Sequence, residues 1–179
     1  KDREMIRNTM TAVSKEDFEK ASIAINGARR IYIVGVRSAA PLANFMYFYF
    51  KMIYDDVRLM SSNSSSEMFE EIYRIGPEDV CVAFSFPRYS MQVQSVVSYA
   101  HDKGAKTIAI TDNDDSPIAE LADYILVAKS NMVSFIDSLT APLSLVNALI
   151  VSSARGRRNA TKQNLAELEK IWAEYDIYE

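Results

Sequence analysis

The centre of this sequence reads Val80-Cys81-Val82-Ala83-Phe84-Ser85-Phe86-Pro87-Arg88-Tyr89-Ser90. It begins as a short apolar run, which is typical of a buried strand, and ends in a polar turn containing Ser85, Arg88 and Ser90. A helix is expected next, because apolar residues follow at helical spacing: Val93, Val96, Val97 and Ala100. Free backbone N–H groups and the positive end of a helix dipole then face the turn, which is a common way to build an anion site.

The turn by itself leaves two interpretations open. In the first, Arg88 offers the fixed donors of its guanidinium group to a phosphate or carboxylate. In the second, the segment is a plain strand-to-helix turn, in which Ser90 caps the helix and Arg88 lies in water. Residues elsewhere in the chain are needed to distinguish these two interpretations.

Composition places the chain among globular domains and makes direct nucleic-acid binding unfavourable. The chain has 179 residues, 49% of them hydrophobic, and 20 basic against 24 acidic side chains give a net charge of −4. One α/β domain with a large core fits this length. Phosphate neutralisation requires a basic face, so we do not expect this segment to grip nucleic acid itself.

Cysteine usage and hydropathy predict a cytoplasmic protein. Cys81 is the only cysteine, it cannot form an internal disulfide, and its apolar surroundings suggest a buried small hydrophobic residue. No apolar run reaches membrane-spanning length, and no signal peptide is visible. The chain starts at Lys1, so we expect a piece of a longer protein or a start that is not shown.

Apolar runs and helical patterns alternate along the chain. Besides the central strand, four runs predict strands: Ile31–Val34, Val57–Met60, Thr107–Thr111 and Tyr124–Val127. Ser14 with Asp17 three residues later predicts a capped helix start. Further helices are expected over Ala39–Tyr54, Glu67–Tyr73 and Ser90–Asp102, from Ser116, from Ser134 or Asp137 to Ala154, and over Asn159–Tyr175.

Five apolar strands alternating with helices predict an α/β fold with three layers (αβα). The sheet should be five-stranded, parallel and doubly wound, in the flavodoxin-like order 2-1-3-4-5. Ligands bind such sheets outside the carboxyl ends of the strands, where the strand order reverses. Three polar loops should meet there: Gly35–Ser38, Ser61–Ser66 and Ser85–Ser90. None contains a dinucleotide fingerprint or a Walker lysine.

Several of these segments together resemble a known family, the sugar isomerase (SIS) domain, and more closely the effector domain of RpiR-type bacterial transcription regulators. The resemblance covers nearly the whole chain and is carried by Ile31–Ser38, Asp79–Ser90, Ala105–Asp112, Ser116–Ala119 and Ala122-Asp123. It implies the fold already predicted and a phosphorylated sugar held by serine- and threonine-rich loops. It also implies a helix-turn-helix domain, absent from this chain, that binds DNA.

The resemblance implies that three serines contact a phosphate group: Ser38, Ser85 and Ser90. The first family loop is Gly-x-Gly-x-Ser, and here Gly35 is kept while Arg37 replaces the second glycine. In the third family loop, Ser-x-Ser-Gly-x-Thr, Arg88 replaces the glycine. Two added cations suggest a more strongly anionic ligand, with a second phosphate or a carboxylate. Alternatively, the arginines pair with acids such as Asp55 or Asp56 and close the pocket.

The residues favour a binding protein over an enzyme, although isomerase activity stays an alternative. Sugar isomerases require a general base near the pocket. The only histidine, His101, is expected at the exposed end of its helix, and Glu67 and Glu70 are the remaining candidates. No His, Cys and carboxylate cluster has metal spacing, and we expect no cofactor, no metal and no catalytic residue. We also predict Ser61 and Ser62 as ligand contacts beside Gly35, Arg37, Ser38, Ser85, Arg88 and Ser90.

The expected domain organisation is a linker or short helix over residues 1–13 and one phosphosugar-binding domain over residues 14–179. The last predicted helix carries a wide apolar stripe: Leu165, Leu168, Ile171, Trp172 and Tyr175. This stripe either folds back on its own domain or contributes to a two-fold interface, so a homodimer or higher homo-oligomer is expected. A third interpretation is a dimerisation module whose pocket has lost its function.

Overall fold

The computed structural model of the protein describes residues 1–130, 132–133 and 136–178. Five parallel strands form its sheet: β1 (Arg30–Val34), β2 (Val57–Met60), β3 (Asp79–Phe84), β4 (Lys106–Thr111) and β5 (Tyr124–Val127). Their order is β2-β1-β3-β4-β5, which confirms the predicted doubly wound topology. A separate antiparallel pair joins β6 (Met132–Val133) to β7 (Ile136–Asp137).

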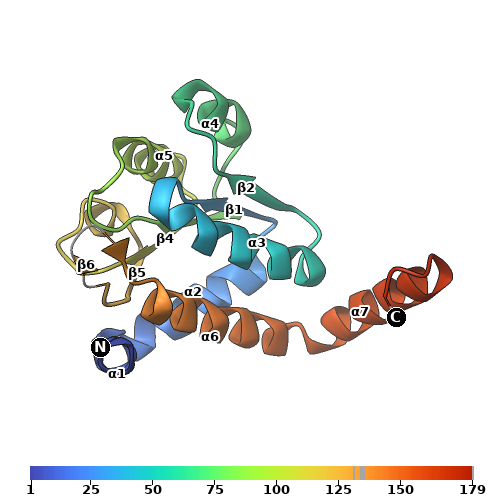
Figure 1. The fold of residues 1–179 in the computed structure, drawn as a ribbon. Coiled ribbons are helices and arrows are strands. Elements are labelled where there is room, and N and C mark those ends of the chain that lie inside the picture. Colours follow the sequence, from blue (N-terminus) through green and yellow to red (C-terminus); the bar gives the residue numbers. More distant parts are fainter. Residues whose placement is uncertain (131, 134–135, 179) are drawn as a thin grey trace.

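Helices cover both faces of this sheet and make the three predicted layers (Figure 1). The helical segments are α1 (Asp2–Ala12), α2 (Lys15–Gly27), η1 (Arg37–Ala39), α3 (Ala40–Ile53), α4 (Ser65–Ile72), α5 (Met91–Asp102), η2 (Ala119–Leu121), α6 (Thr140–Gly156) and α7 (Arg158–Glu174). Strand residues alternate between the two faces. Ile33, Val82 and Phe84 pack with α2, α3 and α6. Val34 and Ala83 pack with α4 and α5 on the other face.

Two helix starts show where local sequence rules predict the structure correctly and where they do not. Ser14 caps α2 as predicted, with its Oγ accepting a hydrogen bond of 3.1 Å from the backbone N–H of Asp17. The predicted start of α6 at Asp137 is wrong, because Asp137 lies in β7 and the helix begins at Thr140. Pro142 favours this later start, since a proline is tolerated in the first helical turn, where its missing N–H has no partner to lose. The other predicted start, Ser134, lies outside the described residues.

The first residues form a helix that packs against the sheet domain. Met5 of α1 is 2% exposed, and the Thr9 hydroxyl accepts a hydrogen bond of 2.8 Å from the backbone N–H of Lys129, just beyond β5. Of the two possibilities for residues 1–13, the structure therefore contains the helix. The division of the chain at residue 13 stays a prediction.

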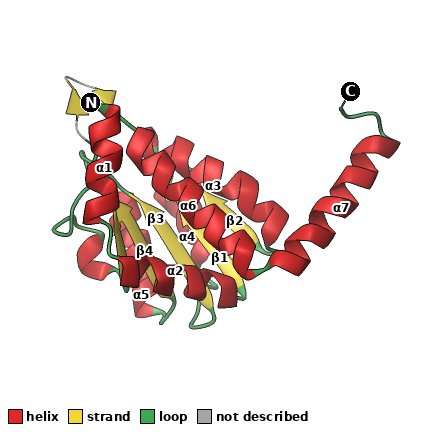
Figure 2. Cartoon of the chain, turned by 90° about the horizontal axis from the view of Figure 1, so that it is seen from below, coloured by secondary structure: helices red, strands yellow, loops and turns green. Residues whose placement is uncertain are grey.

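Helix α7 leaves the body of the molecule. It extends away from the sheet and its covering helices, with the C-terminus at its far end (Figure 2). Its first half contacts α3, where Asn164 Nδ2 donates a hydrogen bond of 3.2 Å to the carbonyl of Met52. None of its residues is buried, and Ile171 remains 45% exposed. The apolar stripe predicted on this helix is thus only partly covered by its own chain.

Within the described part of the chain, no helix is both long enough and apolar enough to cross a bilayer.

Candidate functional site

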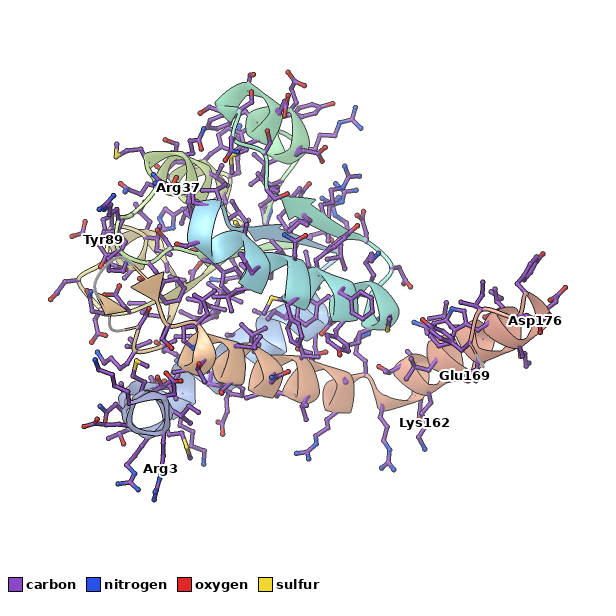
Figure 3. All side chains as sticks on the ribbon, viewed as in Figure 1. Arg3, Arg37, Tyr89, Lys162, Glu169 and Asp176 are labelled. Atoms are coloured by element: carbon purple, nitrogen blue, oxygen red, sulfur yellow. The ribbon has the colours of Figure 1, made fainter. Side chains whose placement is uncertain are left out.

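A cavity of about 360 Å³ lies at the carboxyl ends of β1 and β3. These strands are neighbours in the sheet, with Val34 opposite Ala83, so the loops that follow them lie side by side. Polar lining comes from both loops: Arg37, Ser38, Ser85, Arg88 and Ser90. Arg37 and the neighbouring Tyr89 are labelled in Figure 3, at the end of the molecule remote from α7. The structure therefore brings together the first and third of the predicted polar loops.

Ser85 supplies the unusual feature of this cavity. It follows β3 directly, and its backbone N–H donates 3.2 Å to the carbonyl of Ile110, which extends the β3–β4 pairing by one residue. The side chain is 3% exposed, yet its Oγ has no hydrogen-bond partner among the described residues. Buried hydroxyl groups almost always have a partner, because an unpaired one costs about 1–3 kcal/mol. A ligand atom in the cavity would remove this cost.

Ser90 is the N-cap residue of α5, but its side chain does not cap the helix. Ser90 is also one of the residues that line the cavity. The first-turn N–H groups of an α-helix have no partner within the helix, and the helix dipole adds a partial positive charge at the same place. Serine hydroxyls and helix N–H groups are donors suited to a phosphate group.

Arg37 and Arg88 lie on opposite loops of the cavity, and both side chains are exposed. Arg37 has φ = 55°, in the left-handed region that glycine adopts without strain. The suggested pairing of these arginines with Asp56 is wrong. The Asp56 carboxylate instead forms ion pairs with two other arginines, at 2.5 Å from Arg30 Nε and 3.4 Å from Arg58 Nε. Nor does Asp55 pair with them, because no ion pair among the described residues includes either arginine.

The serine-rich loop after β2 does not share this cavity, which corrects the prediction that three loops converge. Ser61 and Ser62 line a separate hollow with Glu67 and Glu70. Ser62 is also engaged locally, donating to the carboxylate of Glu67 and accepting 3.0 Å from the backbone N–H of Ser64. The reason is topological: β1 stands between β2 and β3, which separates their loops by about 10 Å at the usual strand spacing.

Gly35 belongs to the packing of the site and is not among the residues that line it. A Cβ at this position would meet Ala43 Cβ at 2.9 Å, the Ala39 carbonyl at 3.2 Å and Phe84 Cβ at 3.3 Å. A side chain here would push η1 and α3 away from β3. Gly35 thus lets the two polar loops approach one another.

The remaining reactive side chains lie outside the cavity. His101 is exposed in the last turn of α5, at the opposite end of the helix from Ser90. Cys81 is buried in β3, and burial raises the pKa of its thiol to about 12, so the nucleophilic thiolate is suppressed. Within the ranges that the structure describes, no group of His, Cys, Asp and Glu could hold a metal ion.

Tyr89 was not predicted, although it anchors the loop between Arg88 and Ser90. Its hydroxyl donates 2.8 Å to Asp112 Oδ1 and accepts 3.0 Å from Asn113 Nδ2. Burial, followed by the neighbouring carboxylate of Asp112, raises the pKa of Tyr89, so the phenol stays a hydrogen-bond donor. The available sequence clue was that Asp112 and Asn113 follow the next strand, at the same edge of the sheet.

Comparisons with known proteins agree with this architecture. The family model described as "SIS domain" matches residues 24–152. The sugar isomerase domain of an RpiR transcription factor from Sphaerobacter thermophilus is 25% identical, with a TM-score of 0.88 and 94% coverage of each chain. NanR of Vibrio vulnificus, solved in complex with ManNAc-6P, is 15% identical with a TM-score of 0.83, covering 97% of this chain and 66% of that one.

Two further matches are described as a putative isomerase and as a transcriptional regulator. A putative sugar-phosphate isomerase from Listeria monocytogenes is 20% identical with a TM-score of 0.77, and the match covers 93% of this chain and 90% of that one. An uncharacterised HTH-type transcriptional regulator of Haemophilus influenzae is 26% identical over 123 residues, or 69% of this chain, and the match spans only 42% of its own length. Because the family match covers well over half of the residues, this chain belongs to the SIS-domain family.

Proposed function

We propose that the chain is the ligand-sensing domain of a bacterial transcription regulator and that it binds a phosphorylated sugar in the cavity at β1 and β3. The observation that carries this proposal is the buried hydroxyl of Ser85 at the cavity wall, which has no hydrogen-bond partner in the parts of the chain that the structure describes. Support also comes from the HTH-type regulator among the relatives and from the phosphosugar complex of NanR. In this role the protein works in the cytoplasm, and DNA binding belongs to a helix-turn-helix domain outside this chain.

The phosphate group is expected at the N-terminus of α5. Phosphate oxygens accept hydrogen bonds, and the cavity offers the hydroxyls of Ser38, Ser85 and Ser90 together with first-turn N–H groups of α5. Tyr89 holds this loop to Asp112, so the donors are positioned before the ligand arrives. Preorganised donors lose little conformational freedom on binding, which favours affinity.

An isomerase is the alternative function, and an activity assay distinguishes it from a ligand sensor. The described lining of the cavity contains no carboxylate or imidazole, whereas Glu67 and Glu70 lie in the hollow beside β2. A general base must come within hydrogen-bond reach of the proton that it removes. We therefore expect no interconversion of aldose and ketose phosphates by the purified chain. Ketose formation that disappears in both Glu67→Gln and Glu70→Gln would contradict the sensor role.

The regulator role also calls for a symmetric assembly, and α7 is the proposed interface element. A two-fold dimer matches the symmetry of palindromic operators. Ile171 is 45% exposed and Leu165 is 38% exposed on the stripe of α7, and Trp172 stacks edge-on with Tyr178 at 5.2 Å. Exposed apolar stripes of this kind mark protein–protein contacts. Ligand binding can alter the spacing of two DNA-binding domains across such an interface when two arrangements of the dimer differ in ligand affinity.

We expect the chain to sediment at twice its monomer mass of 20.2 kDa at tens of micromolar. Ile171→Glu places a charge on the stripe and should raise the dimer dissociation constant by at least about tenfold, because interface cores exclude charged groups. Ala166→Glu is the matched control, since Ala166 is exposed on the opposite side of the helix. A wild-type monomer at these concentrations, or equal effects of both variants, would remove α7 as the interface.

A further inference from the structure

We infer that the ligand carries a second anionic group, a carboxylate or a second phosphate, bound by Arg37 and Arg88 at the mouth of the cavity. This inference rests on the proposed phosphosugar function and adds a ligand class to it. Its basis is the position and charge of Arg37 and Arg88 and the backbone conformation of Arg37.

Ser85 and the two arginines of the cavity differ in burial. Ser85 lies in the wall with 3% of its surface exposed, whereas the side chains of Arg37 and Arg88 are exposed. A phosphate at Ser85 and the first turn of α5 already has hydroxyl and N–H donors around it. We place the two guanidinium groups at the outer part of the cavity because both arginines are exposed, and the other end of a sugar would emerge there. An anionic substituent at that end would meet planar donors that match a carboxylate or phosphate.

The charge balance of the cavity points to the same ligand class. The described lining contains two guanidinium groups and no acidic side chain. In the part of the chain that the structure describes, neither arginine forms an ion pair, although Arg29, Arg30 and Arg58 all do. Two unpaired cations facing one cavity attract an anion and repel one another until it binds.

The backbone at Arg37 adds an independent observation. Its φ of 55° lies in the left-handed region, which a side chain with a Cβ adopts only at a cost. Glycine would adopt it freely. Strained conformations of this kind persist mainly at functional sites. Here the strained residue is the first of η1 and one of those that line the cavity.

Calorimetric titration of two matched ligand pairs tests the inference. Glucose 6-phosphate is compared with 6-phosphogluconate, and fructose 6-phosphate with fructose 1,6-bisphosphate. In at least one pair the doubly anionic ligand should bind the wild-type protein about tenfold to a hundredfold more tightly, the range of charge-assisted hydrogen bonds. The affinity ratio is the affinity for the doubly anionic ligand divided by that for its monophosphate partner. Arg37→Gly and Arg88→Gln should each reduce this ratio at least about fivefold, while monophosphate affinity changes by less than about threefold.

Two controls keep the test independent of folding. Arg155→Gln removes an exposed arginine of α6 that is remote from the cavity, and it should preserve all affinities. Arg37→Gly should raise the urea midpoint of unfolding, because it relieves the left-handed strain, even as the affinity ratio falls. A lower affinity ratio in Arg37→Gly together with a lower urea midpoint would contradict the inference.

The outcomes also separate this inference from the proposed function. If both members of each pair bind equally, or if the arginine variants weaken them equally, the arginines hold the same single phosphate; the inference then fails while the phosphosugar function stands. If none of the four sugars binds, both fail.

Discussion

Replacing Ser85 with alanine is expected to weaken phosphosugar binding by about 1–3 kcal/mol, the scale of a lost hydrogen bond to a charged group. The unliganded protein should nevertheless be at least as stable as the wild type. The reason is that the Ser85 hydroxyl is buried and has no hydrogen-bond partner within the described residues, so its removal deletes an unsatisfied polar group and leaves the backbone hydrogen bond to Ile110 in place. A change that stabilises the fold and weakens binding cannot be attributed to misfolding.

Ser153→Ala is the matched control for this variant. Ser153 is 0% exposed on α6, away from the cavity, so it shares the burial of Ser85 without its position. Calorimetry should give wild-type affinity for Ser153→Ala and a dissociation constant about fivefold to 150-fold higher for Ser85→Ala. Unchanged affinity in Ser85→Ala would place the ligand elsewhere on the protein.

Phe84→Ala is expected to lower the free energy of unfolding by about 3–5 kcal/mol, the usual cost of deleting a buried aromatic side chain. Phe84 is 0% exposed at the end of β3, packs with the α2, α3 and α6 layer, and also lines the cavity. Its Cβ lies 3.3 Å from the position that a Gly35 Cβ would take, so it marks where the two loops meet. A cavity here would loosen the site as well as the core.

Urea unfolding followed by circular dichroism measures this effect. Phe48→Ala is the comparison, because Phe48 is a phenylalanine of α3 that is 52% exposed. We expect Phe48→Ala to change the free energy of unfolding by less than about 1 kcal/mol. Phe84→Leu, which keeps most of the volume, should cost less than about 2 kcal/mol. A cost below about 1 kcal/mol for Phe84→Ala would contradict the packing described for β3.

The strand order could be predicted from the sequence because it depends on local patterns. Each of the five strands is an apolar run followed by a helical pattern, and parallel strands joined by right-handed crossovers leave few possible orders. The same reasoning placed the loops that contain Ser38, Ser85 and Ser90 side by side, since the carboxyl ends of β1 and β3 adjoin at the point where the order reverses. The family resemblance predicted which residues of these loops contact a ligand, and that choice stays a prediction.

Other parts of the site depend on contacts that local patterns do not encode. The separation of Ser61 and Ser62 from the cavity follows from the edge position of β2. The anchoring of Tyr89 by Asp112 joins residues 23 positions apart, and neither residue type specifies the other. The direction of α7 depends on its packing against α3 and on the chain around Gly156, so its amphipathic pattern predicted a helix without predicting where it lies.

The most direct test of the central claim is thermal unfolding of the wild-type chain and of Ser85→Ala with hexose 6-phosphates and, separately, inorganic phosphate. A ligand at about 100 times its dissociation constant stabilises the folded state by about 2.7 kcal/mol, which for a chain of this size raises the midpoint by about 5–10 °C. Our account predicts such a rise for at least one sugar phosphate with the wild type, and a rise at least about 3 °C smaller with Ser85→Ala. No rise with any sugar phosphate, or an equal rise in both proteins, would contradict it.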